Sequence, residues 1–337
     1  MNFSILRNLA VASVLLLSAC SNKDESSVSN TVAPSAQSAP TGHLYVGHDT
    51  GPVSLYSLAE FSKLTEIAVG EPPTSQGGHS LALSEDGKLL AVAVAQAKAL
   101  AIVDTNTRQT VHSVLLGSEP SLVQVHGMTA VVARAPLQIS VIDLPTGEIK
   151  RTFNVAIEPQ NMAIASNGQH LVATHENFDE LFVYDLETGE PVQQTDVSEY
   201  GVRPRGVVQS PDGKHLALAM EYSNKVLVLN SEYKVVDEVL TGEVPYAVAY
   251  NQTGSELVVA LVRGKVIQVF DTDTLMLKRE LPVGAQCLRF AFTPEDTHLI
   301  VACGLANKLA VLNYATGELV REIEQTTAPR GLAVSLQ

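Results

Sequence analysis

A phrase of about 40–45 residues recurs along the chain after residue 42. Its clearest copy is PRGVVQSPDGKHLALAMEYSNKVLVLNSEYKVVDEVLTG, from Pro204 to Gly242. The copy begins with an apolar strand, a Pro-Asp-Gly turn and a second apolar strand. A polar loop, a third strand that ends in Asn or Asp, a second turn and a fourth strand follow. A four-stranded unit with this period is typical of the blades of a β-propeller.

The ends of the third strands mark the repeat most clearly. They fall at Ser57, Asp104, Asp143, Asp185, Asn230, Asp271 and Asn313. Between the turns the segments are short and rich in Val, Leu, Ile and Ala, and none carries the long apolar stripe of an amphipathic helix. We therefore predict an all-β fold: a seven-bladed β-propeller with four antiparallel strands per blade.

The two ends of the repeat region are out of phase with each other. The first copy starts at a second strand, His43 to Gly47, and the last ends after a first strand, Pro329 to Ser335. Pairing these two fragments completes one blade and removes two exposed sheet edges. We expect the C-terminal strand to join the first blade and close the ring, so that residues 42–337 form one domain.

Composition limits the partners that the domain can have. The chain has 337 residues, of which 45% are hydrophobic and 17% charged, as expected of a folded protein. Its net charge of −14 argues against nucleic acid, which requires a basic surface, but not against a small anion held by a few arginines. The absence of Trp makes a carbohydrate platform of stacked rings improbable. We expect a monomer.

The N-terminal segment has the pattern of an export signal. Arg7 precedes an apolar run, Leu9 to Leu17, that is too short to span a bilayer, and Leu17-Ser18-Ala19-Cys20 resembles the lipobox of bacterial lipoproteins. The resemblance implies a signal peptide over residues 1–19 and a lipid on Cys20. Ser21 implies the outer membrane, with the periplasmic face expected. The alternatives are an ordinary signal peptide with a coincidental cysteine and a buried N-terminal helix.

Residues 20–41 combine that cysteine with a small, polar, proline-punctuated stretch. Such a stretch buries too little apolar surface to fold, so we expect a flexible tether. The membrane contact is then made through the lipid anchor alone.

The motif P-R-G-x-x-x-S-P-D-G-K, at Pro204–Lys214, followed by x-x-V-x-V-x-N resembles the YVTN family of bacterial β-propellers. That family is related to the haem d1 propeller of cytochrome cd1 and to propeller lactonases. The resemblance covers residues 43–336. It implies the architecture and leaves the activity open, because one scaffold hosts many functions.

In a propeller, the loops that lead into first strands and the loops between second and third strands lie on one face, around the channel. Ligands usually bind there. In this chain those loops carry arginines, histidines and acids, which suit an anionic ligand or a protein partner. The predicted rim consists of His48, His79, His175, Glu176, Arg203, Arg205, Glu221, Arg263 and Arg330.

Each rim residue also has a purely structural interpretation. The Arg203-Pro204-Arg205 segment can hydrogen-bond neighbouring loop carbonyls, and Glu221 can simply pair with Arg205. A lone His175-Glu176 is too little for a metal site, and we predict no metal.

Two alternatives to a binding or scaffold module follow from the family resemblance. In the lactonases, including the 6-phosphogluconolactonase-like branch, a conserved Arg and Glu match Arg205 and Glu221, and a further arginine matches Arg263. These three are the catalytic candidates. The family's catalytic His would fall near residues 158–161, where this chain has Gln160, so the general base is missing unless His175 or His79 replaces it.

The second alternative is a haem d1 or other tetrapyrrole site. It would need an axial ligand from His48, His79 or His175, with the arginines meeting the propionates. The chain has no C-x-x-C-H motif for covalent haem attachment. No cofactor is firmly implied.

Cys287 and Cys303 lie on consecutive predicted strands and would be exposed to an oxidising compartment after export. If Phe292 pairs with His298, the register places the two cysteines opposite each other, within reach of a disulfide. Two buried free thiols are the alternative, and a register slip of one residue would defeat the bond.

Overall fold

The second and third strands of each repeat are apolar at nearly every position, and both of their faces are buried. β5 (Leu89–Val94) and β6 (Ala99–Asp104) each contain five buried residues out of six. A strand that is buried on both faces needs a packed sheet on each side. The outermost strands are polar: β11 (Ile149–Asn154) is exposed at five of six positions. This contrast indicates that the apolar second and third strands of each blade pack between the two neighbouring blades.

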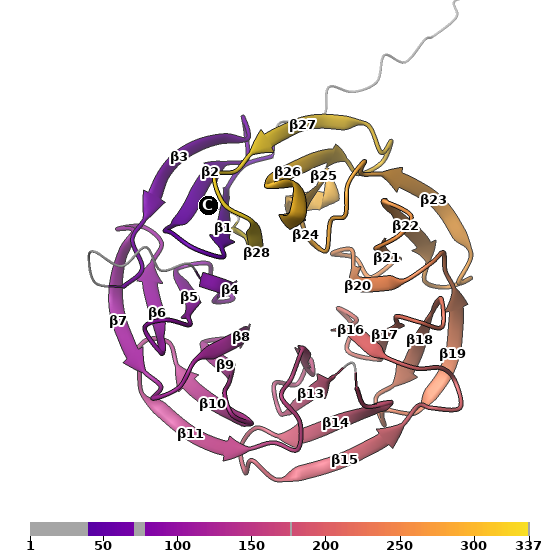
Figure 1. Ribbon diagram of the computed structural model, residues 1–337, viewed down its shortest axis with the longest axis horizontal. Coiled ribbons are helices and arrows are strands. Elements are labelled where there is room, and N and C mark those ends of the chain that lie inside the picture. The colour runs from indigo at the N-terminus through magenta and orange to yellow at the C-terminus, as the bar shows by residue number, and fades with distance from the viewer. Residues whose placement is uncertain (1–39, 71–77, 176, 336–337) are drawn as a thin grey trace, which may run out of the picture. The chain divides into compact units, whose positions relative to one another are not determined.

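The computed structural model describes residues 40–70, 78–175 and 177–335, which belong to one compact unit. The predicted signal peptide, Cys20, residues 21–39 of the tether and Glu176 lie outside the described residues. Within them the strands form seven four-stranded antiparallel sheets arranged in a ring (Figure 1). The prediction of a seven-bladed all-β propeller is confirmed. We number the blades I to VII in chain order.

The strands of each blade are given from the innermost outwards. Blade I contains β28 (Pro329–Ser335), β1 (His43–His48), β2 (Val53–Ser57) and β3 (Ser62–Ile67). Blade II contains β4 (Gly78–Leu83), β5, β6 and β7 (Gln109–Leu115). Blade III contains β8 (Pro120–His126), β9 (Thr129–Arg134), β10 (Gln138–Asp143) and β11. Blade IV contains β12 (Asn161–Ile164), β13 (His170–Thr174), β14 (Glu180–Asp185) and β15 (Pro191–Asp196).

Blade V contains β16 (Pro204–Gln209), β17 (His215–Met220), β18 (Lys225–Asn230) and β19 (Val235–Leu240). Blade VI contains β20 (Pro245–Tyr250), β21 (Glu256–Leu261), β22 (Val266–Asp271) and β23 (Leu277–Pro282). Blade VII contains β24 (Arg289–Phe292), β25 (His298–Cys303), β26 (Lys308–Asn313) and β27 (Leu319–Glu324). Two short 3-10 helices, η1 (Pro294–Asp296) and η2 (Gly304–Ala306), flank β25.

The ring closes as predicted. β28 pairs antiparallel with β1, with His43 opposite Ser335 and Tyr45 opposite Ala333. The last strand of the chain therefore supplies the innermost strand of the blade that the first strands begin.

The core is divided among the interfaces between blades. In the described residues the buried apolar side chains form seven clusters, and each cluster joins two neighbouring blades. One of them packs Leu44 and Tyr56 of blade I against Ile300 and Leu309 of blade VII, so the closing interface is as apolar as the others. Burial of about 25 cal/mol per Å² of apolar surface makes these interfaces the main source of the ring's stability.

In six of the seven blades the third strand ends in Asp or Asn, and this side chain fixes the turn that follows. The Asp104 carboxylate accepts the backbone N–H of Thr107 at 2.7 Å, and Asp185 accepts that of Thr188 at 2.7 Å. These bonds lower the pKa of both carboxyl groups. The carboxylate or amide oxygen accepts hydrogen bonds from backbone N–H groups of the turn that have no partner in a neighbouring strand. This explains why Asp or Asn recurs at this position of the repeat.

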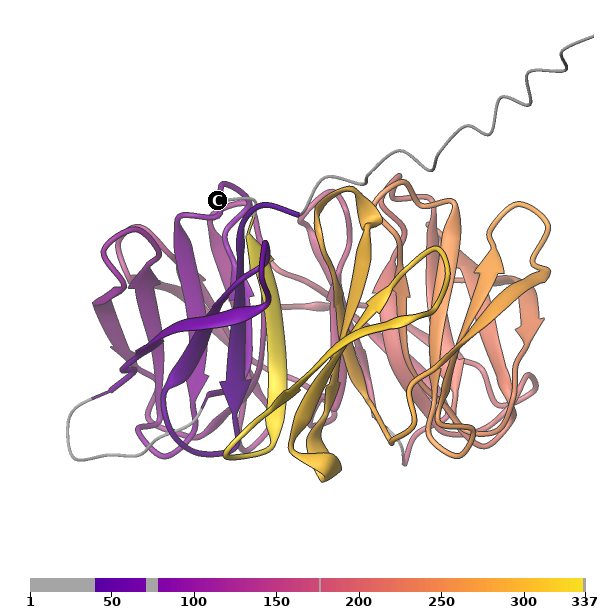
Figure 2. The same cartoon turned by 90° about the horizontal axis from the view of Figure 1, so that it is seen from above.

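The two ends of the strands define two faces of the ring (Figure 2). His48 of β1 is paired with Pro329 of β28 at one end, and His43 with Ser335 at the other. We call the first end the mouth face; it carries the loops that lead into the innermost strands and the loops between second and third strands. Residue 40 enters the propeller at the opposite face. In residues 40–70, 78–175 and 177–335, no helix has the length and apolar character needed to cross a bilayer.

Candidate functional site: the arginine-lined mouth

Equivalent positions of the seven innermost strands meet at the mouth face. In five blades the strand is preceded or begun by proline, at Pro120, Pro159, Pro204, Pro245 and Pro329. The residue after each proline is, in the same order, Ser121, Gln160, Arg205, Tyr246 and Arg330. All five line one of two pockets around the channel. In these five blades the repeat thus places one side chain at an equivalent position around the channel.

The two pockets share Ser121, Leu122 and Tyr246, so they adjoin. Each has a volume of about 340 Å³, at the small end of ligand-binding cavities. We call them together the mouth. One pocket is further lined by Glu158, Pro159, Gln160, His175 and Arg205. The other is further lined by Asp49, Gln286, Leu288, Arg289, Ala302, Gly304, Leu305, Pro329 and Arg330.

Arg205 is held from three sides. Its guanidinium donates to the Gln160 side-chain oxygen and, at 2.8 Å, to the Tyr246 hydroxyl. It also stacks on the Tyr246 ring, 4.5 Å from the centroid. Tyr246 can approach because Gly206 follows Arg205: a Cβ there would lie 2.6 Å from the Tyr246 carbonyl oxygen. Gly206 therefore allows β16 and β20 to pass closely at the mouth.

Glu221 lies behind Arg205 and is only 7% exposed. Its carboxylate accepts the Arg203 Nε at 2.7 Å and lies 3.6 Å from the Arg205 Nε. Arg203 in turn lies over the Tyr222 ring, 4.5 Å from its centroid. Glu221 does not line the mouth. The contacts therefore give it the role of a counter-ion that fixes two arginines.

Arg289 is a mouth residue that the sequence analysis did not identify. It is half-buried at the start of β24, where its Nη1 donates to the Leu288 carbonyl at 2.9 Å and its guanidinium lies 5.8 Å from the Tyr246 ring centroid. Burial lowers the pKa of Arg289, and the charges of Arg205 and Arg330 act in the same direction. Within the described part of the chain, no carboxylate forms an ion pair with Arg289.

Arg330 completes the group of cations. It holds Asp49 through two bonds, from Nε at 2.7 Å and Nη2 at 2.9 Å, and this carboxylate raises its pKa. Arg205 and Arg330, the two predicted arginines that line the mouth, thus each have an acidic neighbour. Arg289 has no such neighbour in the described part of the chain.

The predicted histidines differ in their surroundings. His48 is 4% exposed and packs inside blade I, where Nδ1 donates to the Thr327 carbonyl at 3.4 Å and Nε2 accepts from the Ser54 hydroxyl at 3.1 Å. Burial lowers its pKa. Both nitrogens are thus engaged within the fold, and His48 lines neither pocket of the mouth. The side chain of His79 lies outside the described residues.

His175 does line the mouth, in the same pocket as Arg205. Its Nδ1 accepts the backbone N–H of Asn177 at 3.1 Å, and its ring packs edge-on against Phe178. A neutral ring in this arrangement carries its proton on Nε2. It is therefore set to donate a hydrogen bond, not to act as a general base.

Arg263 is separated from the other candidates. Its side chain is exposed, its Nη1 lies 3.7 Å from a carboxylate oxygen of the equally exposed Glu243, and it does not line the mouth. The structure thus brings together Arg203, Arg205 and Glu221, and leaves Arg263 outside.

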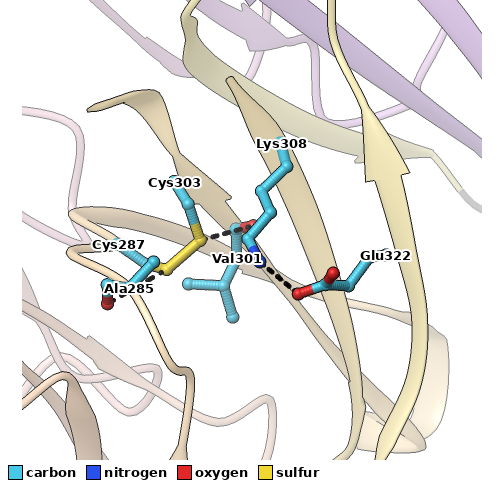
Figure 3. The surroundings of a disulfide bond; sticks show 6 residues. All are labelled: Ala285, Cys287, Val301, Cys303, Lys308 and Glu322. Atoms are coloured by element: carbon cyan, nitrogen blue, oxygen red, sulfur yellow. Dashed lines mark hydrogen bonds and ion pairs between the residues drawn. A yellow bond between two sulfur atoms is a disulfide. The ribbon is translucent and has the colours of Figure 1, made fainter. Parts of the chain in front are cut away.

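Cys287 and Cys303 are joined by a disulfide, with their Cα atoms 4.0 Å apart (Figure 3). The predicted register was wrong by one residue: Phe292 pairs with Leu299 instead of His298. A one-residue shift at the start of the innermost strand restores the alignment, as it does between Pro204 and Val207 in β16. Cys287 thereby takes the place of the proline in other blades. The bond ties two segments that line the mouth, residues 286–289 and 302–305.

Within the described ranges, no group of three or more His, Cys, Asp or Glu side chains is arranged to hold a metal ion. The cations, one ring nitrogen donor and several apolar side chains of the mouth are suited to bind a compact anion.

Fold and mouth together define a seven-bladed β-propeller with an arginine-lined channel opening. A family model described as "Lactonase, 7-bladed beta-propeller" matches residues 140–235, a range that includes Gln160, His175, Arg205 and Glu221. No curated protein matches the sequence.

Two solved structures show the same fold. A functionally unknown protein from Desulfotomaculum acetoxidans DSM 771 superposes with a TM-score of 0.77 at 17% identity, over 87% of this chain and 98% of that one. Kuenenia stuttgartiensis hydrazine synthase superposes with a TM-score of 0.63 at 19% identity, over 89% of this chain and 99% of that one. At these identities the likeness concerns the fold alone.

Proposed function

We propose that the mouth is a binding site for a small carboxylate-bearing ligand. The observation that carries the proposal is Arg289, a half-buried guanidinium without a carboxylate partner in the described residues of a chain whose net charge is −14. A buried cation is costly unless an anion compensates it. The two other arginines of the mouth, Arg205 and Arg330, each have a carboxylate neighbour, so Arg289 is the cation whose anion is left for the ligand to supply.

The geometry supports binding more than catalysis. Tyr246 and Gln160 fix Arg205, and Asp49 fixes Arg330, so these cations are preorganised. Preorganised donors reduce the entropy lost on binding. Of the two histidines that could replace the missing general base, His175 uses Nδ1 as an acceptor for Asn177, and the side chain of His79 lies outside the described residues.

Isothermal titration calorimetry with gluconate on the purified full chain tests the proposal. We expect Arg289→Gln to weaken binding about 10-fold or more, as loss of a charge-assisted hydrogen bond does. Arg263→Gln, which removes the same charge from an exposed side chain outside the mouth, should leave the affinity unchanged. Equal affinity of the wild type and Arg289→Gln would refute the proposal.

A lactone hydrolase is the second candidate, favoured by the family model that covers Gln160, His175, Arg205 and Glu221. Purified protein would be assayed against a panel of lactones beside Arg205→Ala and Glu221→Ala. If the wild type turns over a lactone substantially and both variants lose that activity, the lactone hydrolase replaces the binding module as the proposed function. If the wild type turns over none of the lactones, the lactone hydrolase is refuted as a candidate function.

We further propose that Cys20 carries the lipid that attaches the protein to a membrane, with the outer membrane as its site. The lipobox-like segment Leu17–Cys20 supports this. Incorporation of labelled palmitate in cells tests the anchor: the wild type should be labelled and Cys20→Ser should not.

A further inference from the structure

The wall of the mouth next to Arg289 is apolar. Leu288 lines it from the segment that precedes β24, Ala302 from β25 and Leu305 from η2. Leu122 and the ring of Tyr246 lie along the part that both pockets share. One pocket thus combines an arginine that has no carboxylate partner in the described residues with several apolar side chains.

Leu305 is the most exposed large apolar residue of the described chain, at 78%. A single exposed leucine is ordinary on a protein surface. Leu305, however, lines the same pocket as Arg289 and Leu288. Gly304 brings η2 close to the innermost strand of blade I, because a Cβ there would lie 3.3 Å from the Pro329 carbonyl oxygen. The position of η2 therefore places an apolar side chain at the opening.

A hydrophilic anion would use only part of this pocket. Phosphate or a sugar acid would satisfy Arg289 and leave Leu288 and Leu305 in contact with water. A ligand with a carboxylate at one end and an apolar chain at the other satisfies both, since the chain removes apolar surface from water while the carboxylate meets the guanidinium.

We propose that the mouth selects monocarboxylates with an apolar body, a specificity that rests on the binding function proposed above. Arg289 binds the carboxylate, and Leu288 and Leu305 contact the chain. The volume of about 340 Å³ limits the ligand to a small molecule.

Hexanoate and gluconate form a matched pair of probes, because both are six-carbon monocarboxylates that differ in hydroxyl groups. By calorimetry, hexanoate should bind about 10-fold more tightly than gluconate, a ratio typical of burying a leucine-sized apolar surface. Leu305→Ser should weaken hexanoate about 3- to 10-fold and leave gluconate within about 2-fold. Leu240→Ser is the control, since Leu240 is similarly exposed but lies outside the mouth.

The outcomes separate the two proposals. If gluconate binds as tightly as hexanoate and both depend on Arg289, the apolar specificity is refuted and the carboxylate site stands. The same holds if Leu305→Ser changes neither affinity. If Arg289→Gln alters neither affinity, the carboxylate site itself is refuted, and the specificity falls with it.

Discussion

Glu256 of β21 shows how a buried charge is accommodated away from the mouth. It is 8% exposed and accepts hydrogen bonds from Arg279 at 2.8 and 3.0 Å, with the Lys278 ammonium 2.7 Å away. Burial alone would raise the pKa of Glu256, but these two cations outweigh it and lower the pKa to about 2. The ion pair lies within blade VI. Arg279 also lies over the ring of Tyr314, which follows β26, so it connects blade VI to blade VII.

This pKa predicts how stability depends on pH. The folded-state pKa lies below the ordinary value of 4.5, so the contribution of Glu256 is complete above about pH 4.5 and is lost as the pH falls towards 2. Glu256→Gln should lower the free energy of unfolding at pH 7 by about 2–3 kcal/mol and flatten its decline between pH 5 and 3. Urea unfolding at several pH values measures both effects.

The control for that series is Glu243→Gln, which removes an exposed carboxylate whose only described ion pair is the loose contact with Arg263. It should change the free energy of unfolding by no more than about 0.5 kcal/mol. If the free energy of unfolding of Glu256→Gln changes with pH in the same way as that of the wild type, the lowered pKa of Glu256 is contradicted.

At the residue scale the sequence predicted types of side chain better than their directions. It placed Arg205 and Glu221 at the mouth face and raised their pairing as the structural alternative, and the structure shows that contact. It also placed His48 and Arg263 on the rim, but His48 packs inside blade I and Arg263 does not line the mouth. A loop position is fixed by the repeat, whereas the direction of a side chain depends on packing that the pattern does not encode.

Among the elements, the close approach of β16 and β20 is the one most sensitive to substitution. In Gly206→Ala the new Cβ would lie 2.6 Å from the Tyr246 carbonyl and 3.1 Å from the Ala247 Cα, both of them backbone atoms. The strands must move apart, so we expect a loss of about 1–3 kcal/mol in the free energy of unfolding. Binding of hexanoate should weaken as well, since Arg205 and Tyr246 shift.

Gly242→Ala is the matched substitution, because the atom in its way is the Leu261 Cδ1 at the tip of a side chain. It should cost less than about 1 kcal/mol. Thermal and urea unfolding of the two variants compare them directly. Equal stability of Gly206→Ala and the wild type would show that the strands are less tightly packed than described.

The Cys287–Cys303 disulfide supports the part of the mouth that blade VII contributes. Its cysteines are separated by 16 positions in sequence. A disulfide that closes a loop of that length restricts the unfolded chain and thereby stabilises the folded state by about 3 kcal/mol. Cys287→Ala/Cys303→Ala should lose this amount, and dithiothreitol should destabilise the wild type but not the variant. Free thiols at both Cys287 and Cys303, found on titrating the unfolded, unreduced protein, would contradict the bond.

The elements of blade VII also show the limit of the sequence analysis. The repeat correctly predicted two facing strands, but the assumed pairing of Phe292 with His298 ignored the shift at the start of the innermost strand. Five blades use proline to mark the start of the innermost strand, where blade VII has Cys287, so the residue that corresponds to Arg205 and Arg330 is Leu288. Arg289 lies one position further along, where blade V has Gly206, and the repeat therefore did not predict it as a mouth residue.

For the molecule as a whole, the repeat determined nearly everything about the architecture. Strand types, turn residues and the unpaired ends predicted seven blades and a ring closed by β28 with β1. The ring is what brings together residues as distant in sequence as Asp49, Arg205 and Arg330. The ligand was not predictable, because it depends on the few side chains at the mouth that vary between blades.

The central claim is that Arg289 and the apolar wall form one site for a carboxylate ligand. A crystal structure with 6-bromohexanoate tests it most directly, since anomalous scattering locates the bromine. We predict the carboxylate beside Arg289 and the bromine in the mouth near Leu288 and Leu305. A bromine site elsewhere on the molecule, with no ligand density at Arg289, would contradict the account.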